Sequence, residues 1–197
     1  MLNLGFLASH GGSNMQAIID ACKSNALNAK PCCVISNNSE CGALLKARSE
    51  NIPYYHISLK HYPDNLAVNQ AIIEKFSSHG VDTVILAGYM KILAPEVIQH
   101  FHGRVLNIHP ALLPKFGGHG MFGMNVHEAV IQAGEKVSGP TVHLVDPLYD
   151  HGRILQQAEV PVFGDDTAET LAARVLAKEH WLYTDTLVKI EQNIIQI

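Results

Sequence analysis

The sequence has no excess of positive charge: its 14 Lys and Arg residues are outnumbered by 18 Asp and Glu residues, which gives a formal net charge of −4. We therefore expect no basic face for nucleic acid, although a local basic patch around a small anionic ligand is compatible with this charge. The sequence also lacks any apolar run near the ~20 residues that a membrane-spanning helix needs. The N-terminal stretch MLNLGFLASHGG has no basic region before its apolar residues, so it predicts a first strand and not a signal peptide.

Cysteine is scarce, and no two of the four cysteines form a Cys-x-x-Cys pair; they are Cys22, Cys32, Cys33 and Cys41. This spacing matches neither a zinc site nor a small disulfide framework. We interpret them as reduced, mostly buried thiols of a cytoplasmic protein, because disulfides are rare in a reducing compartment. The 12 histidines include no His-Glu-x-x-His motif and form no cluster with cysteine, so we expect no metal ion in the site.

Hydrophobic residues make up 47% of the 197 residues, which suits the core of a single domain, 1–197. In the first half of the chain, continuous apolar runs alternate with apolar residues at helical spacing. The runs predict strands at 2–9, 30–37, 52–58, 81–89 and 104–110, and the helical patterns lie at 14–25, 41–51, 64–80 and just after Pro95. Continuous apolar strands between helices are typical of a parallel sheet that is covered on both faces. The predicted fold class is therefore α/β, with a Rossmann-like, open and mostly parallel sheet.

The pattern changes after Pro110. Residues 137–146 and 153–162 predict two strands joined by a short glycine-containing turn, which we expect to add a C-terminal antiparallel hairpin to the sheet. Residues 165–192 predict a long final helix that opens with Asp and Thr as candidate caps.

A glycine-containing loop, ASHGGSNMQAI at 8–18, leads from the first predicted strand into the first helix. Gly11 and Gly12 allow close approach of a ligand, and free N–H groups at the helix start favour an anion such as phosphate. The loop lacks both Gly-x-Gly-x-x-Gly and the Lys-Ser/Thr of ATP-binding loops, so the motif indicates neither a dinucleotide nor ATP. The alternative is a tight turn in which Ser13 or Asn14 only caps the helix.

Two polar residues interrupt the apolar strand in RVLNIHPALLPKFGG, at 104–118. Because side chains alternate along a strand, Asn107 and His109 face the same side, at the carboxyl end where open α/β sheets bind ligands. An imidazole can move a proton near neutral pH, and an amide N–H can donate to an oxyanion. The alternative is a buried, satisfied histidine beside an asparagine that bonds a neighbouring loop.

A carboxylate beside His109 would favour the charged form of its imidazole. The second hairpin offers two carboxylates in DPLYDHG, at 146–152: Asp150 in the turn, and Asp146 beside Pro147. Spacing along the chain does not select between them.

With these residues the chain resembles the folate-dependent glycinamide ribonucleotide formyltransferases of purine synthesis, in order along essentially its whole length. The shared stretches are GGSNMQAII, ILAGYMKILAP, NIHPALLPKFGG, VSGPTVHLVDPLYDHGRILQQAEVPV and LAARVLAKEHWLY. The Asn-x-His-Pro-x-Leu-Leu-Pro block with a later Asp is specific to folate formyltransferases, and the Gly-Ser-Asn loop narrows the resemblance to the ribonucleotide enzyme. The resemblance implies transfer of a formyl group from 10-formyltetrahydrofolate, as co-substrate, to the primary amine of glycinamide ribonucleotide.

By position, the resemblance implies three groups of functional residues. The catalytic set would be Asn107, His109 and Asp150, with Asp150 preferred to Asp146 because of its distance from the histidine of TVHLV. The substrate phosphate and ribose would be bound by Gly12, Ser13, Asn14 and Glu179. The folate would be bound by Met90, Lys91, Ile92 and Leu93, together with Asn107, Asp146 and Asp150. Both partners are then small molecules, and assembly into a homodimer stays open.

Some positions depart from the family pattern. Asn65 stands where many relatives carry an Arg near the folate tail, so Lys60 or Lys91 would have to replace that contact. Pro140 and Arg153 flank the catalytic hairpin where relatives carry other residues. The glycine-rich loop at 116–123 is expected to be mobile and to close over bound ligand.

Three other functions compete with this interpretation. Methionyl-tRNA formyltransferase needs an extra basic C-terminal domain, and formyltetrahydrofolate hydrolase an N-terminal regulatory domain, so the length of this chain favours neither. A catalytically silent phosphosugar- or folate-binding module is disfavoured by the intact set of Asn107, His109 and Asp150.

Overall fold

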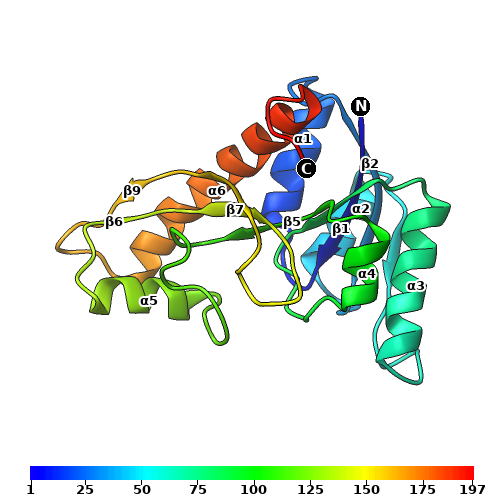
Figure 1. The fold of residues 1–197 in the computed structure, drawn as a ribbon, viewed down its shortest axis with the longest axis horizontal. Helices are drawn as coiled ribbons and strands as arrows, with labels where there is room; N and C mark the ends of the chain where they lie inside the picture. The colour runs from blue at the N-terminus through cyan, green and yellow to red at the C-terminus, as the bar shows by residue number, and fades with distance from the viewer.

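A seven-stranded sheet with the strand order β3-β2-β1-β4-β5-β7-β8 organises the chain, and helices cover both of its faces (Figure 1). The computed structural model describes residues 1–197. The strands are β1 (Leu2–Ala8), β2 (Ala29–Ser36), β3 (Tyr54–His56), β4 (Thr83–Leu86), β5 (Val105–His109), β6 (Val137–Ser138), β7 (Thr141–Leu144), β8 (Ile154–Gln157) and β9 (Val160–Pro161). The helices are α1 (Ser13–Lys23), α2 (Gly42–Ser49), α3 (Asn65–Ser78), α4 (Pro95–His100), α5 (Met124–Gln132) and α6 (Ala168–Glu191).

The five strands from β3 to β5 pair in parallel, as the continuous apolar runs predict. The four inner strands β2, β1, β4 and β5 are mostly buried, whereas the edge strand β3 is not. One core cluster of 24 residues lies between the sheet and α1, α2 and α6, and a second cluster of 17 lies between the sheet and α3 and α4. The predicted α/β class with an open, mostly parallel sheet is confirmed. None of the helices combines the length and apolar character needed to cross a lipid bilayer.

The predicted C-terminal hairpin is present, but it is divided. β7 pairs antiparallel with β5, and β8 pairs antiparallel with β7, so this half extends the main sheet as expected. The other half, β6 with β9, forms a separate two-stranded sheet. The division occurs at Gly139 and Pro140, where Gly139 has φ +144° and a Cβ atom would collide with the Ala158 carbonyl. The prediction of two unbroken strands is therefore wrong at Gly139 and Pro140.

Helix α5 has no counterpart among the sequence-based predictions. It begins directly after Gly123, which has φ +56° and no side-chain cap, and it buries Val126, His127 and Val130. Its three buried residues lie on one helical face, but the glycines before it favour a loop. The helix follows the loop at 116–123 directly and packs against α6.

The final helix lies across the sheet and contributes to the site from the far end of the chain. Its N-cap is Thr167, whose side chain forms a capping box with Thr170, in agreement with the expected Thr cap. Farther along, the fully buried Tyr183 hydroxyl donates to the Leu106 carbonyl at 2.8 Å. This bond fixes α6 against β5 and so sets the position of Glu179, one helical turn earlier.

Candidate active site

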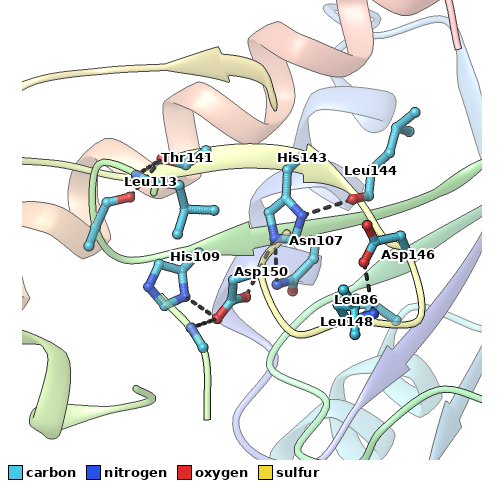
Figure 2. Close-up of polar contacts among 12 residues, drawn as sticks. Leu86, Asn107, His109, Leu113, Thr141, His143, Leu144, Asp146, Leu148 and Asp150 are labelled. Atoms are coloured by element: carbon cyan, nitrogen blue, oxygen red, sulfur yellow. Dashed lines mark hydrogen bonds and ion pairs between the residues drawn. The ribbon is translucent and has the colours of Figure 1, made fainter. Parts of the chain in front are cut away.

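Strand β5 carries Asn107 and His109 to the carboxyl edge of the sheet, on one side of the strand (Figure 2). Val105, Leu106 and Ile108 are buried and hold the strand in the core. His109 is also buried, with 3% of its surface exposed, whereas Asn107 is half-buried. Both polar side chains border one cavity of about 610 Å³.

The aspartate beside His109 is Asp150. The Nδ1 atom of His109 lies 3.4 Å from Oδ2 of Asp150, and the same carboxylate oxygen accepts the Gly118 N–H at 3.0 Å. The Nε2 atom of His109 lies 2.7 Å from the Phe116 carbonyl oxygen. Both ring nitrogens therefore face oxygen acceptors, an arrangement that suits an imidazolium because each of its nitrogens carries a proton to donate.

Asp146 lies away from this pair. Its carboxylate accepts the Leu148 N–H at 2.9 Å and lies 3.1 Å from Nδ1 of His151, which is exposed. It borders a small neighbouring cavity of about 90 Å³, together with Asn107 and Asp150. The spacing along the chain does not decide which of the two carboxylates is the partner of His109. In the structure only Asp150 contacts His109, while Asp146 borders the small cavity, where it can contact a ligand.

His143 on β7 borders the same site, although the sequence predicts no role for it. The antiparallel register places it opposite Asn107, and its Nε2 atom lies 3.1 Å from Nδ2 of Asn107 and 3.7 Å from Oδ1 of Asp150. Burial lowers the pKa of His143, so the ring favours the neutral form, and Nδ1 lies 2.9 Å from the Leu144 carbonyl oxygen. With Nδ1 protonated toward that carbonyl, Nε2 accepts from the Asn107 amide and fixes its orientation.

The start of helix α1 is open to an anion. Its N-cap is Gly12, with φ +64°, and no side chain caps it, so Ser13 and Asn14 do not have the capping role considered as the alternative. The first turn contains no acidic residue. A Cβ atom on Gly12 would lie 2.8 Å from the Ala43 Cβ atom, so glycine is required both by the backbone angle and by the contact with α2. The free N–H groups and the helix dipole favour a phosphate here.

Glu179 on α6 reaches the same cavity from the C-terminal part of the chain. Its Oε2 atom accepts a hydrogen bond from Nδ2 of Asn14 at 2.7 Å. Burial raises the pKa of Glu179 to about 7, and the Asn14 bond opposes this shift only in part. The Oδ1 atom of Asn14 is buried without a partner, so the pair retains an unused acceptor beside the cavity.

The segment that follows β4 forms the wall between the cavities. Ser9, at the end of β1, accepts the Met90 N–H at 2.8 Å and donates to Oδ1 of Asn37 at 2.5 Å. The Ser9 N–H also bonds the Gly88 carbonyl at 3.0 Å. These bonds tie the ends of β1, β2 and β4 together and hold the wall in place. Neither Ser9 nor Asn37 was identified from the sequence, because no motif links the residues that follow three different strands.

Three adjoining cavities meet at this wall. We name them the central cavity (about 610 Å³, with His109 and Glu179), the hairpin cavity (about 90 Å³, with Asp146) and the outer cavity (about 890 Å³, with Lys60). The residues implied for folate binding divide among them. Met90 borders the central and outer cavities, Lys91 borders all three, Ile92 borders the hairpin and outer cavities, and Leu93 borders only the hairpin cavity.

The positions that depart from the family pattern fall outside the central cavity. Asn65 borders the outer cavity. Pro140 lies at the division between β6 and β7, and its carbonyl accepts the Ala158 N–H at 3.1 Å. Arg153 donates to the Gln196 carbonyl and so bonds the C-terminal segment. Residues 118–123 of the glycine-rich loop border the central cavity, while the expected closure of this loop stays a prediction.

Comparisons with known proteins identify relatives of the chain. A family model described as formyl transferase matches residues 2–187. Phosphoribosylglycinamide formyltransferase of Haemophilus influenzae is 42% identical over 93% of this chain and 84% of that protein, and the chloroplastic one of Vigna unguiculata is 44% identical over 98% and 62%. Glycinamide ribonucleotide transformylase 1 from Symbiobacterium toebii superimposes with a TM-score of 0.93 at 36% identity, covering 100% of this chain and 91% of that one. The chain spans less than two-thirds of the length of its plant relatives.

Proposed function

The chain belongs to the formyl transferase family, and on that premise we propose that it transfers the formyl group of 10-formyltetrahydrofolate to the primary amine of glycinamide ribonucleotide. The products are formylglycinamide ribonucleotide and tetrahydrofolate, a step of purine synthesis. The relatives named for this activity support the assignment. The observation that carries it is the placement of Asn107, His109 and Asp150 in one cavity that Asn14, in the first turn of the uncapped helix α1, also borders.

The central cavity suits attack of an amine on a formyl carbon. As the nitrogen attacks, the formyl oxygen becomes an oxyanion, which needs hydrogen-bond donors already in position. The Asn107 amide is one such donor, and the Nε2–H of His109 becomes the second when it exchanges the Phe116 carbonyl for the formyl oxygen; each such donor is typically worth ~3 kcal/mol of barrier. His143 orients the first donor and Asp150 stabilises the charge of the second.

Proton transfer completes the reaction. The attacking amine loses a proton, and N10 of the folate gains one as the carbon–nitrogen bond to it breaks. His109, Asp150 and a water molecule are the candidate carriers. No covalent enzyme intermediate is required, and no metal ion is needed because the proposed donors stabilise the developing charge.

Glycinamide ribonucleotide would occupy the central cavity with its phosphate at the start of α1. The N–H groups around Gly12, Ser13 and Asn14 would bind the phosphate. Glu179 would accept from the ribose hydroxyls, assisted by the unused Oδ1 acceptor of Asn14. This placement brings the amine end of the substrate toward Asn107 and His109, which border the same cavity. Holding the amine and the formyl group close together and correctly oriented contributes to catalysis, because the reaction then takes place within one complex and not by a bimolecular encounter.

The folate would lie along the other two cavities. The hairpin cavity, bordered by Leu93 and Asp146, would take the pterin ring, close to Asn107. The outer cavity would take the glutamate tail, because it is bordered by Lys60 and Lys91 and by no acidic residue. Lys60 would then supply a charge for the tail that the neutral Asn65, which borders the same cavity, does not carry.

We also propose that residues 1–197 act as a single domain in the cytoplasm, on small molecules and not on nucleic acid or membranes. One continuous sheet joins the phosphate loop after β1 to the hairpin at β7 and β8, which supports a single unit. The four cysteines are unpaired, which is in keeping with a reducing compartment.

The decisive experiment mixes the protein with glycinamide ribonucleotide and 10-formyltetrahydrofolate and follows loss of the formyl group by absorbance. We expect turnover that requires both substrates and yields one formylated amine for each folate consumed. Loss of formyl at the same rate without the amine would identify a formyltetrahydrofolate hydrolase instead. Tight binding of both compounds without turnover would identify a non-catalytic binding module.

A further inference from the structure

Strand β8 carries two adjacent glutamines, and each of them bonds the hydroxyl of a fully buried threonine. Nε2 of Gln157 donates to Oγ1 of Thr141 on β7 at 2.9 Å. Oε1 of Gln156 accepts from Oγ1 of Thr186 on α6 at 3.1 Å. Because side chains alternate along a strand, the two pairs lie on opposite faces of the sheet. The Gln156 pair joins β8 to α6, whereas the Gln157 pair lies on the face that carries Asn107.

Thr141 and Gln157 together hold the backbone of Leu113, four residues after His109. The Thr141 hydroxyl accepts the Leu113 N–H at 3.0 Å and donates to the Ala111 carbonyl at 2.6 Å. Gln157 donates to the Leu113 carbonyl at 2.9 Å. Thr141 is also the partner of His109 in the register of β5 and β7, and Figure 2 shows its bond to Leu113. Both backbone polar groups of Leu113 are therefore bonded to side chains of the hairpin.

The Leu113 side chain continues this contact to the glycine-rich loop. A Cβ atom on Gly117 would lie 2.6 Å from Cδ2 of Leu113, so the side chain lies directly against Gly117. The carbonyl oxygen just before Gly117 lies 2.7 Å from Nε2 of His109, and the N–H just after it donates to Oδ2 of Asp150 at 3.0 Å. We call His109 and Asp150 the catalytic pair. A displacement of Leu113 would thus reach both members of this pair.

We infer that Thr141 and Gln157 are positioning residues for the catalytic pair. By holding Leu113 they fix the first part of the glycine-rich loop, and the loop in turn keeps the two members of the pair aligned. The inference rests on the proposed function, in which Asp150 stabilises the charged form of His109. Neither Thr141 nor Gln157 borders any of the three cavities, so each acts through the loop and not by contact with a substrate.

The test uses the two glutamine–threonine pairs of β8 against each other. Thr141→Val and Gln157→Ala each remove a bond to Leu113, and the matched controls are Thr186→Val and Gln156→Ala. We expect kcat to fall by about 10- to 100-fold in Thr141→Val, because a misplacement of about 1 Å costs up to about 100-fold. In Gln157→Ala the fall should be smaller, since the threonine still holds the Leu113 N–H.

Michaelis constants and a rescue variant separate positioning from binding and from stability. The KM values for both substrates should stay near those of the wild type in Thr141→Val, and Thr141→Ser, which keeps the hydroxyl, should restore kcat. Thr186→Val loses a buried hydroxyl of the same kind and should keep the wild-type kcat. An equal fall of kcat in Thr141→Val and Thr186→Val, or no fall in Thr141→Val, would overturn the inference. If Thr141→Val does not fold, the comparison of Gln157→Ala with Gln156→Ala decides, because Gln157 is exposed.

Hydrogen exchange of the Gly118 amide, followed by NMR without substrates, tests the same link independently of the reaction. Thr141→Val and Gln157→Ala should speed this exchange several-fold, because the bond from Gly118 to Asp150 opens more often, while both controls should exchange as the wild type does. Unchanged exchange in both variants shows that the inference is wrong, even if kcat falls. If the wild type shows no turnover with glycinamide ribonucleotide, the proposed function fails, and the exchange rates alone decide whether the two residues hold the loop.

Discussion

Replacement of Glu179 by glutamine should make the protein more stable at alkaline pH. Only 8% of Glu179 is exposed, and burial raises its pKa from 4.5 to about 7. In the unfolded chain the carboxyl ionises near pH 4.5, whereas in the folded chain it keeps its proton up to about pH 7. Between these values the folded state holds the extra proton, so stability falls as the pH rises. Above pH 7 both states are ionised, and the full cost of a buried carboxylate is present.

The size of this effect follows from the shift in pKa. One pKa unit corresponds to ~1.4 kcal/mol, so the shift of Glu179 costs the folded state about 3 kcal/mol at pH 8. Glutamine has nearly the same shape and no charge, and its amide oxygen can still accept the Asn14 N–H. Glu179→Gln should therefore resemble the wild type in unfolding free energy near pH 4.5 and exceed it by about 3 kcal/mol at pH 8.

Urea denaturation of both proteins across pH 4.5 to 8 measures this difference. Glu128→Gln is the matched control, because Glu128 is an exposed carboxylate on α5, and this substitution should produce no such rise. A difference between wild type and Glu179→Gln that stays constant across the pH range would refute the reasoning.

The same substitution should weaken the proposed substrate site. A carboxylate accepts stronger hydrogen bonds from ribose hydroxyls than an amide oxygen does, and such bonds contribute about 1.5–3 kcal/mol. We expect the KM for glycinamide ribonucleotide to rise roughly 10- to 100-fold in Glu179→Gln at pH 8. In the wild type this KM should rise as the pH falls below 7, because protonation of Glu179 removes one acceptor.

Three further predictions address other parts of the molecule. His109→Ala and Asp150→Asn should each lower kcat by about 10²- to 10³-fold while leaving the thermal unfolding transition cooperative; near-normal turnover in either would contradict its assigned role. Lys60→Ala should raise the KM for 10-formyltetrahydrofolate a few-fold, because an exposed charge contributes only about 0.2–1 kcal/mol. Salt screens such a charge, so the difference between the two proteins should shrink at high salt. A KM independent of salt in both proteins would argue against a contact between Lys60 and the glutamate tail. Gly139→Ala should lower the unfolding free energy, measured by urea denaturation, by about 1–3 kcal/mol, because Gly139 has φ +144° and the added Cβ would meet the facing backbone. The control is Gly164→Ala, at a position with open space around it, which should change the unfolding free energy little.

The parallel part of the fold could be predicted because its signal is local. A strand such as β1 is buried on both faces, so its residues are apolar almost without interruption, and helices between such strands have apolar residues at a different period. The hairpin was predicted less well. One glycine and one proline divide it into two sheets, and their effect depends on the carbonyl of Ala158 that faces them. Helix α5 was missed because its first residue follows a glycine-rich stretch that has the composition of a loop.

Contacts between distant residues are even harder to predict in the site. The resemblance, and not the spacing, favoured Asp150 over Asp146; the structure then places Asp150 against His109 because the hairpin turns back across the end of β5. His143 could have been suspected from its alternation with Thr141, but its contact with Asn107 needs the antiparallel register. That register is a property of two paired strands and is absent from either strand alone.

The sequence by itself determined which side chains share a face and which loop is a candidate for an anion. Alternation along one strand puts Asn107 and His109 on the same side. That neither Ser13 nor Asn14 caps α1 was decided only by the structure. The tertiary structure alone decided which distant groups meet them. Asn14 and Glu179 are 165 positions apart, and they form a buried hydrogen bond because α6 packs against α1. Backbone geometry is set by neighbouring residues, whereas a contact across the sheet depends on strand order and helix packing, which every element of the chain determines together.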